Sequence, residues 1–103
     1  MQIDIQTRGL ILTEELRIHV ERRLQFALSR FQDRVQRIAV CLSNADSSGA
    51  ALQCDLHIHV KGWPDVLIED TEADIYVAIN RAVSRAGRTL ERQRLYGHLD
   101  SPS

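Results

Sequence analysis

Apolar and polar residues alternate along three stretches of the chain, and a period of two is typical of half-buried β-strands. In the first stretch, Ile3 and Ile5 share one side while polar residues occupy the other. Residues 44–49 are rich in Asn, Asp, Ser and Gly and predict the turn of a hairpin between the second and third stretches. The four predicted strands are residues 2–8, 36–43, 52–61 and 66–71.

Two longer stretches repeat their apolar residues every three or four positions, which predicts helices with one buried face. Thr13 is a suitable N-cap for the first helix, and Glu14 and Glu15 suit the positive end of its dipole. We expect Thr71 or Asp74 to cap the second helix. The expected buried stripes are Leu16, Val20, Leu24, Ala27, Leu28 and Phe31, over about five turns, in the first helix and Ile75, Ile79, Ala82, Val83, Ala86 and Leu90 in the second.

The predicted order β-α-β-β-β-α indicates an α+β fold with both helices packed on one face of a four-stranded sheet. We expect one domain over residues 1–96 and a short C-terminal tail over 97–103 that frays. If the inward residues of the hairpin face one another, Cys54 lies opposite Val40 and Cys41 points to the other side of the sheet. This arrangement excludes a disulfide between the two cysteines.

Composition narrows the functional classes. The chain has 103 residues, of which 44% are apolar and 26% are charged, as in ordinary globular domains. Its net charge of −1 means that any nucleic-acid binding must use local patches. The N-terminus lacks a basic-then-apolar leader, and no apolar run approaches about 18 residues, so we expect a cytoplasmic protein without membrane contact.

The second predicted helix carries a row of arginines opposite its apolar stripe. At about 100° per residue, Arg81, Arg85, Arg88 and Arg92 fall within roughly 60° of one another. Like charges this close cost a helix roughly 0.2–0.5 kcal/mol per pair, and the planar guanidinium group suits phosphate oxygens. A solvated helix face is the ordinary alternative for a charged row, but we interpret this row as a phosphate-binding face.

The first predicted helix adds three arginines on one flank, Arg22, Arg23 and Arg30. The i, i+4, i+8 spacing of Arg22, Phe26 and Arg30 sets an aromatic ring between two cations, so Phe26 is a candidate for base stacking. Trp63, in the second turn, is a second candidate for stacking on a base or on a protein partner. The alternatives are a core-edge position for Phe26 and a core-covering position for Trp63.

The sequence offers little enzyme chemistry. It contains no glycine-rich phosphate loop, no GxSxG elbow and no HExxH motif. His57 and His59 share one face of a predicted strand, and a metal would need further ligands, for which Asp55 and Glu69 are the candidates. Histidines exposed on an open sheet are the commoner case, so we expect no metal, no cofactor, no small-molecule substrate and no catalytic residue.

Residues 2 to about 95 resemble the bacterial ribosome hibernation family, which includes hibernation-promoting factor, ribosome-associated inhibitor A and proteins called sigma-54 modulation proteins. The most specific segment is Glu72–Asn80, which is similar to the family's Asp-Met-Tyr-Ala-Ala-Ile-Asp sequence entering its last helix. Residues Gln2–Ile5, Thr13–Arg17 and Ile38–Ser43 resemble its first strand, the start of its first helix and its second strand. These segments keep the family's order and spacing over nearly the whole chain.

The resemblance implies a ribosome-binding domain that occupies the tRNA and mRNA channel of the small ribosomal subunit and blocks translation in stationary phase or stress. It implies rRNA as the partner and, in some bacteria, a separate small ribosome modulation factor as a helper. Because the chain ends soon after the last helix, it resembles the short form of the family. The implied RNA-binding residues are Arg22, Arg23, Arg30, Arg85, Arg88, Arg92 and Arg94, to which the arginine row adds Arg81.

The sequence departs from the family pattern at three points. Arg81 occupies a position that is neutral in many relatives, Glu91 stands where a basic residue is common, and the hairpin tip around Asp46 lacks the usual lysines or arginines. This thinner basic footprint lowers the expected affinity for the ribosome. Two other functions stay open: a protein-binding regulator that uses the same arginine face without RNA contact, and a metal-dependent activity at His57 and His59.

Overall fold

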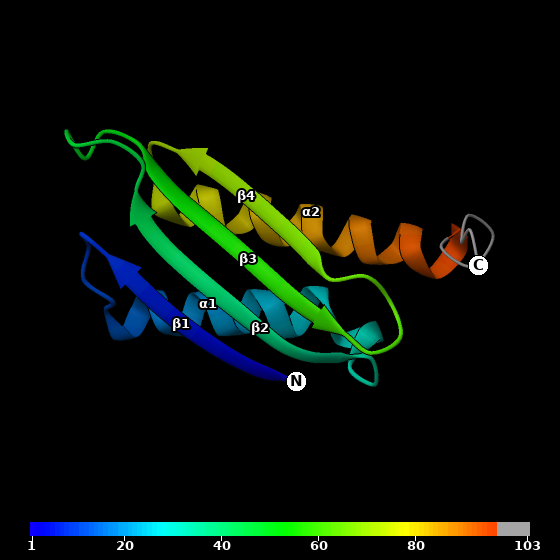
Figure 1. The fold of residues 1–103 in the computed structure, drawn as a ribbon. Helices are drawn as coiled ribbons and strands as arrows, with labels where there is room; N and C mark the ends of the chain where they lie inside the picture. Colours follow the sequence, from blue (N-terminus) through cyan, green and yellow to red (C-terminus); the bar gives the residue numbers. More distant parts are fainter. Residues whose placement is uncertain (97–103) are drawn as a thin grey trace.

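The computed structural model describes residues 1–96, which fold in the predicted β-α-β-β-β-α order (Figure 1). The predicted tail over 97–103 lies outside the described residues. Within residues 1–96, no helix is both long and apolar enough to cross a membrane. The elements are β1 (Gln2–Arg8), α1 (Glu14–Ala27), a 3-10 turn (Ser29–Phe31), β2 (Val35–Asn44), β3 (Leu52–Val60), β4 (Val66–Glu72) and α2 (Ile75–Tyr96).

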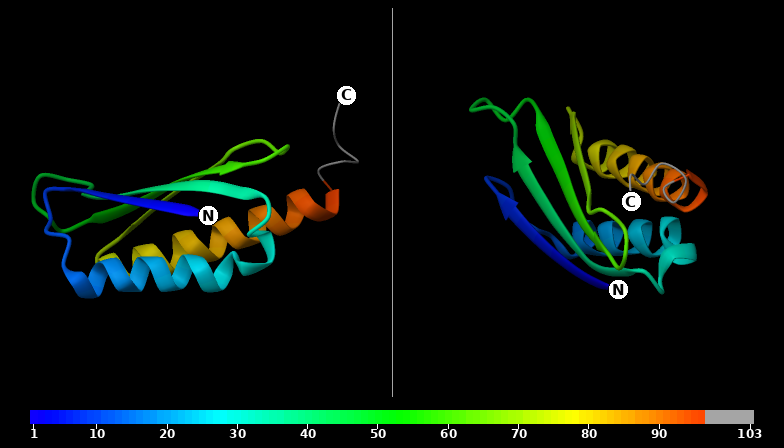
Figure 2. Two further views of the ribbon diagram at one scale, coloured as in Figure 1. Left: turned by 90° about the horizontal axis from the view of Figure 1, so that it is seen from below. Right: turned by 45° about the vertical axis from the view of Figure 1, so that its right-hand side comes forward.

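The four strands form one sheet in the order β1-β2-β3-β4. β1 is parallel to β2, and α1 makes the crossover connection that a parallel pair requires. β2, β3 and β4 are antiparallel neighbours. Both helices cover one face of the sheet and leave the other face open (Figure 2), which confirms the predicted α+β architecture.

The core lies between the sheet and the two helices. The strands bury alternate residues and the helices bury one stripe each, so both periods turn their apolar residues toward the same space. Among the described residues, no polar or charged residue is buried. Fully buried large side chains from α1, β2, β3 and α2 meet there, among them Leu24, Ile38, Leu56, Ile79 and Leu90.

The hairpin of β2 and β3 has the predicted faces but a different register. Cys54 pairs with Leu42, whereas we predicted Val40 as its partner. The turn causes the difference, because a backbone hydrogen bond of 2.8 Å from Ala45 N to Ala51 O closes the hairpin and fixes the pairing. The shift is an even number of residues, so the inward residues still face the core, and both cysteines are free thiols as predicted.

The first helix begins at the predicted cap and ends earlier than predicted. Thr13 Oγ1 accepts a hydrogen bond from the backbone N–H of Leu16 at 3.1 Å. The α-helix stops at Ala27, and the 3-10 turn that follows carries Phe31 into the core. The apolar stripe therefore continues past the end of the α-helix, because a tighter turn keeps the same side buried.

Asp74 caps the second helix, and Thr71, the other predicted cap, belongs to β4. Asp74 Oδ1 accepts a hydrogen bond from the backbone N–H of Tyr76 at 2.8 Å. The backbone carbonyl of Asp74 accepts the first helical hydrogen bond, from Ala78 N at 3.0 Å. These two contacts satisfy backbone groups at the junction and set the direction in which α2 leaves the sheet.

Candidate nucleic-acid interface

The two helices run side by side in the same direction, and their outer surfaces form one layer over the sheet (Figure 2). A hydrogen bond joins them, with His19 Nε2 and Asn80 Oδ1 2.8 Å apart. The His19 ring also meets Tyr76 edge-on, with ring centroids 4.9 Å apart. Sequence periodicity missed these contacts because it gives the buried side of each helix and not the flanks that touch.

The first half of the predicted arginine row lies on the flank of α2 that borders β4. Arg81 Nε is 3.5 Å from Glu72 Oε2. Arg85 Nη1 donates to the backbone oxygen of Glu69 at 2.6 Å and lies 3.4 Å from Asp70 Oδ2. Both partner carboxylates belong to β4, so this strand partly neutralises two of the predicted RNA-binding arginines.

The second half of the row has no such partners. Arg88 and Arg92 are exposed, and within residues 1–96 neither side chain forms an ion pair or a hydrogen bond. Their guanidinium groups can therefore bind a ligand without loss of a contact to another residue in the described part of the chain. A hollow of about 410 Å³ on this flank is lined by Asp70, Asn80, Arg81, Ser84, Arg85 and Arg88.

Glu91 forms ion pairs with two of the predicted RNA-binding arginines, one in the 3-10 turn and one in α2. Arg30 Nη2 lies 3.5 Å from Glu91 Oε2, and Arg94 donates to the other oxygen of the same carboxylate. The hydrogen bond from Arg94 and the positive charges of both arginines lower the pKa of Glu91, so this carboxylate is ionised at neutral pH. Glu91 thus places an acid in the middle of a basic group.

Arg22 and Arg23 lie beside the junction of the two helices, near Tyr76. Arg22 is exposed and has no ion pair in the described part of the chain. The Nε atom of Arg23 is buried and has no hydrogen-bond partner among residues 1–96. A buried donor without an acceptor costs free energy. The hollow at this place measures about 580 Å³ and is lined by Glu15, Ile18, His19, Arg22, Arg23 and Tyr76.

The two candidates for stacking differ in exposure. Phe26 is 72% exposed, so its ring is free to meet a base. Trp63 is half-buried and packs against the core, with its ring edge-on to Phe31 and the guanidinium carbon of Arg34 4.7 Å from its centroid. These contacts favour the core-covering interpretation of Trp63, whereas the exposure of Phe26 keeps base stacking open.

Seven of the eight predicted arginines fall into three groups on the outer helix layer, and the eighth, Arg92, is exposed on α2. One group borders β4, one surrounds Glu91 and one lies near Tyr76. Four of the eight have an acid partner, and the side chains of those four are 46% to 70% exposed. Ion pairs this exposed are weak, so a phosphate can displace them.

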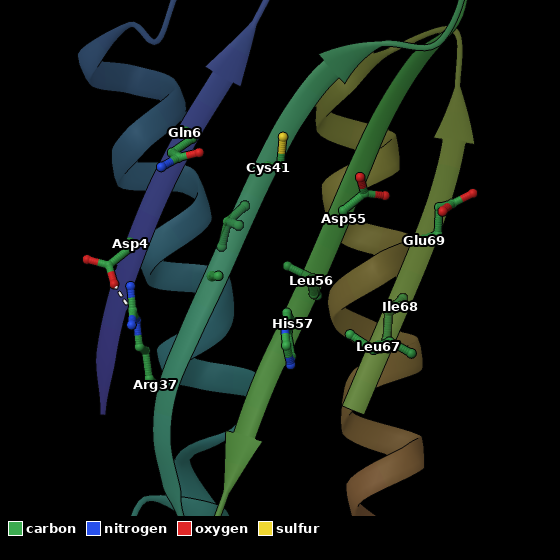
Figure 3. Close-up of a pocket in the computed structure, with 12 residues that line it drawn as sticks. Asp4, Gln6, Arg37, Cys41, Asp55, Leu56, His57, Leu67, Ile68 and Glu69 are labelled. Carbon is green, nitrogen blue, oxygen red and sulfur yellow. Dashed lines mark hydrogen bonds and ion pairs between the residues drawn. The ribbon is translucent and has the colours of Figure 1, made fainter. Parts of the chain in front are cut away.

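The open face of the sheet has a different character. It carries a hollow of about 480 Å³ bordered by the carboxylates of Asp4, Asp55 and Glu69 (Figure 3). Arg37 also lines this hollow, but it donates to Asp4 at 2.8 Å and so its charge is largely compensated. The carboxylates repel phosphate, and the helix layer is therefore the better surface for RNA.

The histidines on this open face meet a different acid from the two that we proposed. His57 Nε2 is 3.0 Å from Asp65 Oδ2, and His59 Nδ1 is 3.1 Å from the same oxygen. Asp55 instead accepts a hydrogen bond from Gln53. The hydrogen bond from His57 and the nearby imidazoles lower the pKa of Asp65. Asp55 and Glu69 were the candidates for further ligands, whereas the acid that lies against both histidines is Asp65, in the turn before β4.

Comparisons with known proteins identify a family and a shared fold. A family model described as "Sigma 54 modulation protein / S30EA ribosomal protein" matches residues 3–95. The crystal structure of the N-terminal domain of Thermus thermophilus Protein Y is 31% identical, with a TM-score of 0.76, and the match covers 89% of this chain and 98% of that one. A ribosomal subunit interface protein from Coxiella burnetii has the same fold, with 15% identity, a TM-score of 0.78 and coverage of 92% and 99%. A comparison with curated proteins found no match.

Proposed function

The chain belongs to the sigma 54 modulation protein / S30EA ribosomal protein family, and we propose that it inhibits translation by binding the small ribosomal subunit in the channel for tRNA and mRNA. The family is one of ribosome-associated proteins, so the ribosome is the partner and the cytoplasm is the compartment.

The observation that carries this proposal is the contrast between the two faces of the molecule. The helix layer exposes arginines, of which Arg22, Arg88 and Arg92 have no acid partner within residues 1–96. The open sheet face is bordered by carboxylates. A polyanion such as rRNA therefore meets attraction on one side and repulsion on the other, which orients the domain with its helices toward the RNA.

The proposed mechanism is competition for space. The domain forms no covalent bond with the ribosome and instead fills volume that mRNA and the anticodon stems of tRNA need. Its affinity comes mainly from the neutralisation of phosphates by arginines, with release of counterions. The exposed ring of Phe26 lies beside the arginines of α1 and offers a stacking surface to an unpaired base.

Salt dependence reports how many arginines take part. If only the four arginines without an acid partner contact phosphates, the slope of log K against log salt is about −2.8 to −3.6, at roughly −0.7 to −0.9 per contact. If all eight take part, the slope is about −5.6 to −7.2. The slope therefore distinguishes a footprint confined to the unpaired arginines from one in which phosphates displace the carboxylates of the chain.

Co-sedimentation with purified small subunits tests the proposal. We expect the Arg85→Glu/Arg88→Glu variant to lose binding while its circular dichroism spectrum stays unchanged. Arg8→Glu/Arg37→Glu is the matched control, because it makes the same charge change on strands of the open sheet and should bind nearly as the wild type does. Excess tRNA should displace the wild-type protein. Full binding by the Arg85/Arg88 variant, or no competition by tRNA, would contradict the proposal.

A second candidate function is a regulator that binds an acidic protein surface. The observation in its favour is that arginines of α2 already form ion pairs with the carboxylates of Glu72, Asp70 and Glu91. Treatment of a lysate with RNase before ribosomes are pelleted separates the two functions. Association that depends on intact RNA supports ribosome binding, and association with a partner that survives the RNase treatment supports the protein-binding function.

A further inference from the structure

Two histidines and one aspartate converge on the open sheet face, on the side of the molecule opposite the arginines of the two helices. His57 and His59 belong to β3 and point to the same side, as residues two apart in a strand do. Asp65 comes from the turn before β4 and places one carboxylate oxygen within 3.1 Å of a nitrogen from each imidazole. One ligand atom from each of the three residues lies within 4.8 Å of the other two.

The turn that carries Asp65 is held firmly against the rest of the domain. Lys61 N donates to Arg34 O at 2.8 Å, and Arg34 Nη1 donates back to Lys61 O at 3.0 Å. Gly62 has a φ of +78°, which suits a residue without a side chain and lets the chain reverse tightly. Because the histidines stand on a strand and the aspartate on an anchored turn, the three groups are positioned before any ligand arrives.

The geometry and chemistry of these three groups suit a divalent metal ion. Zinc binds imidazole nitrogen and carboxylate oxygen at about 2.0–2.2 Å, so two ligands of a tetrahedral site lie about 3.3–3.5 Å apart. The present nitrogen–oxygen separations of 3.0 and 3.1 Å need only a small expansion to admit the ion. The side chains of the three residues are 40% to 46% exposed, which leaves an entry path.

We propose that His57, His59 and Asp65 form a binding site for one Zn²⁺ ion, with the fourth coordination position open to water or to a donor from a partner. Three protein ligands with one open position are the pattern of accessible zinc sites, in contrast to the closed four-ligand sites that stabilise a fold. The sequence favoured plain surface histidines because it did not show that Asp65 reaches both rings.

The charges around the site are compatible with a cation. Arg37 pairs with His59 across β2 and β3, but its guanidinium group is directed toward Asp4 (Figure 3), to which it donates at 2.8 Å. The hollow beside His57 is bordered by the carboxylates of Asp55 and Glu69, which attract a divalent ion toward the sheet. The site is independent of the arginines on the helix layer, so the proposal does not rest on the proposed ribosome binding.

A zinc titration of tag-free protein at pH 7.5 against a chromogenic chelator tests the site. We expect one equivalent of Zn²⁺ to bind the wild type. His57→Ala, His59→Ala and Asp65→Asn should each weaken binding by at least about 10- to 100-fold, since loss of an outer partner alone has that effect. Asp55→Asn and Glu69→Gln are matched controls on the same face and should change the affinity less than about threefold. A Cys41→Ser variant should keep the full stoichiometry.

Thermal unfolding supplies a second measurement that does not use the chelator. A ligand that binds only the folded protein raises the melting temperature, so added Zn²⁺ should raise it for the wild type and not for the His57→Ala/His59→Ala variant. Without zinc the wild type and the double variant should have similar circular dichroism spectra, because both histidines are on the surface. Equal zinc binding by the wild type and this double variant, or loss of zinc on Cys41→Ser instead, would overturn the proposal.

Discussion

Removal of two carboxylates from β4 should strengthen binding to the small subunit. Asp70 lies 3.4 Å from Arg85, and Glu72 lies 3.5 Å from Arg81. Both acids compete with phosphate for these arginines. The Asp70→Asn/Glu72→Gln variant keeps the shape of both side chains and removes two negative charges. It leaves Arg81 and Arg85, the first half of the arginine row, without acid partners.

The size of the effect follows from the distances in the structure. A phosphate about 4 Å from each guanidinium group would stand about 7 Å from the carboxylate on its other side, and two unit charges at that distance repel by about 0.6 kcal/mol in water. A Debye length of about 8 Å lowers this to roughly 0.25 kcal/mol at physiological salt. The two acids together therefore cost about 0.5–1.2 kcal/mol, and their removal should tighten binding about 2- to 7-fold.

A co-sedimentation titration at two salt concentrations measures this gain. The control is Asp4→Asn/Asp55→Asn, which removes the same net charge from the open sheet face. We expect the change in binding free energy for the control to be less than half of the change for the Asp70→Asn/Glu72→Gln variant. The gain in affinity of that variant should become smaller as the salt concentration rises.

An unchanged or weaker affinity for the β4 variant would refute the role of Arg81 and Arg85 in phosphate binding. An equal gain for the control would show that only the net charge of the domain matters, and the argument for an oriented helix layer would then fail.

Two further predictions concern the fold. Gly87→Ala should stabilise the protein by about 0.5–1 kcal/mol in urea unfolding, because alanine is the better helix former and the added Cβ would lie 3.8 Å from Ala27 O, an ordinary contact; a loss of stability would mean that the helices tolerate no added methyl group. Burial raises the pKa of the Cys54 thiol to about 12, so a thiol reagent at pH 8 should label Cys41 quickly and Cys54 only after unfolding; equal rates in the native protein would contradict the buried position.

The fold was largely predictable because each element repeats one simple period. The alternation in β3 and the stripe in α2 identified most of their buried residues, and Thr13 marked the start of α1. The stripe in α2 was wrong at two positions, because Ile75 is only partly buried and Ala78, which was not predicted, is fully buried. The register of the hairpin was not predictable in this way, since a shift of two residues keeps every side chain on the same face. Only the backbone contact between Ala45 and Ala51 in the turn decides it.

The sequence identified the cations of the candidate site but not the acids that pair with them. Spacing along α2 identified the arginine row, yet the acids beside it come from the neighbouring strand and meet it only in the folded protein. The same limit explains Asp65, which lies eight residues from His57 in sequence and reaches it because the turn folds back over the sheet. Pairings between elements depend on tertiary geometry that periodicity does not contain.

A cryo-electron microscopy structure of the purified protein bound to small ribosomal subunits tests the central claim most directly. We predict that the domain lies in the channel for tRNA and mRNA with α1 and α2 against rRNA, and with the guanidinium groups of Arg88 and Arg92 about 3–4 Å from phosphate oxygens. The open sheet face should point away from the nearest RNA. Density for the domain outside the channel, or with the sheet face against rRNA, would contradict this account.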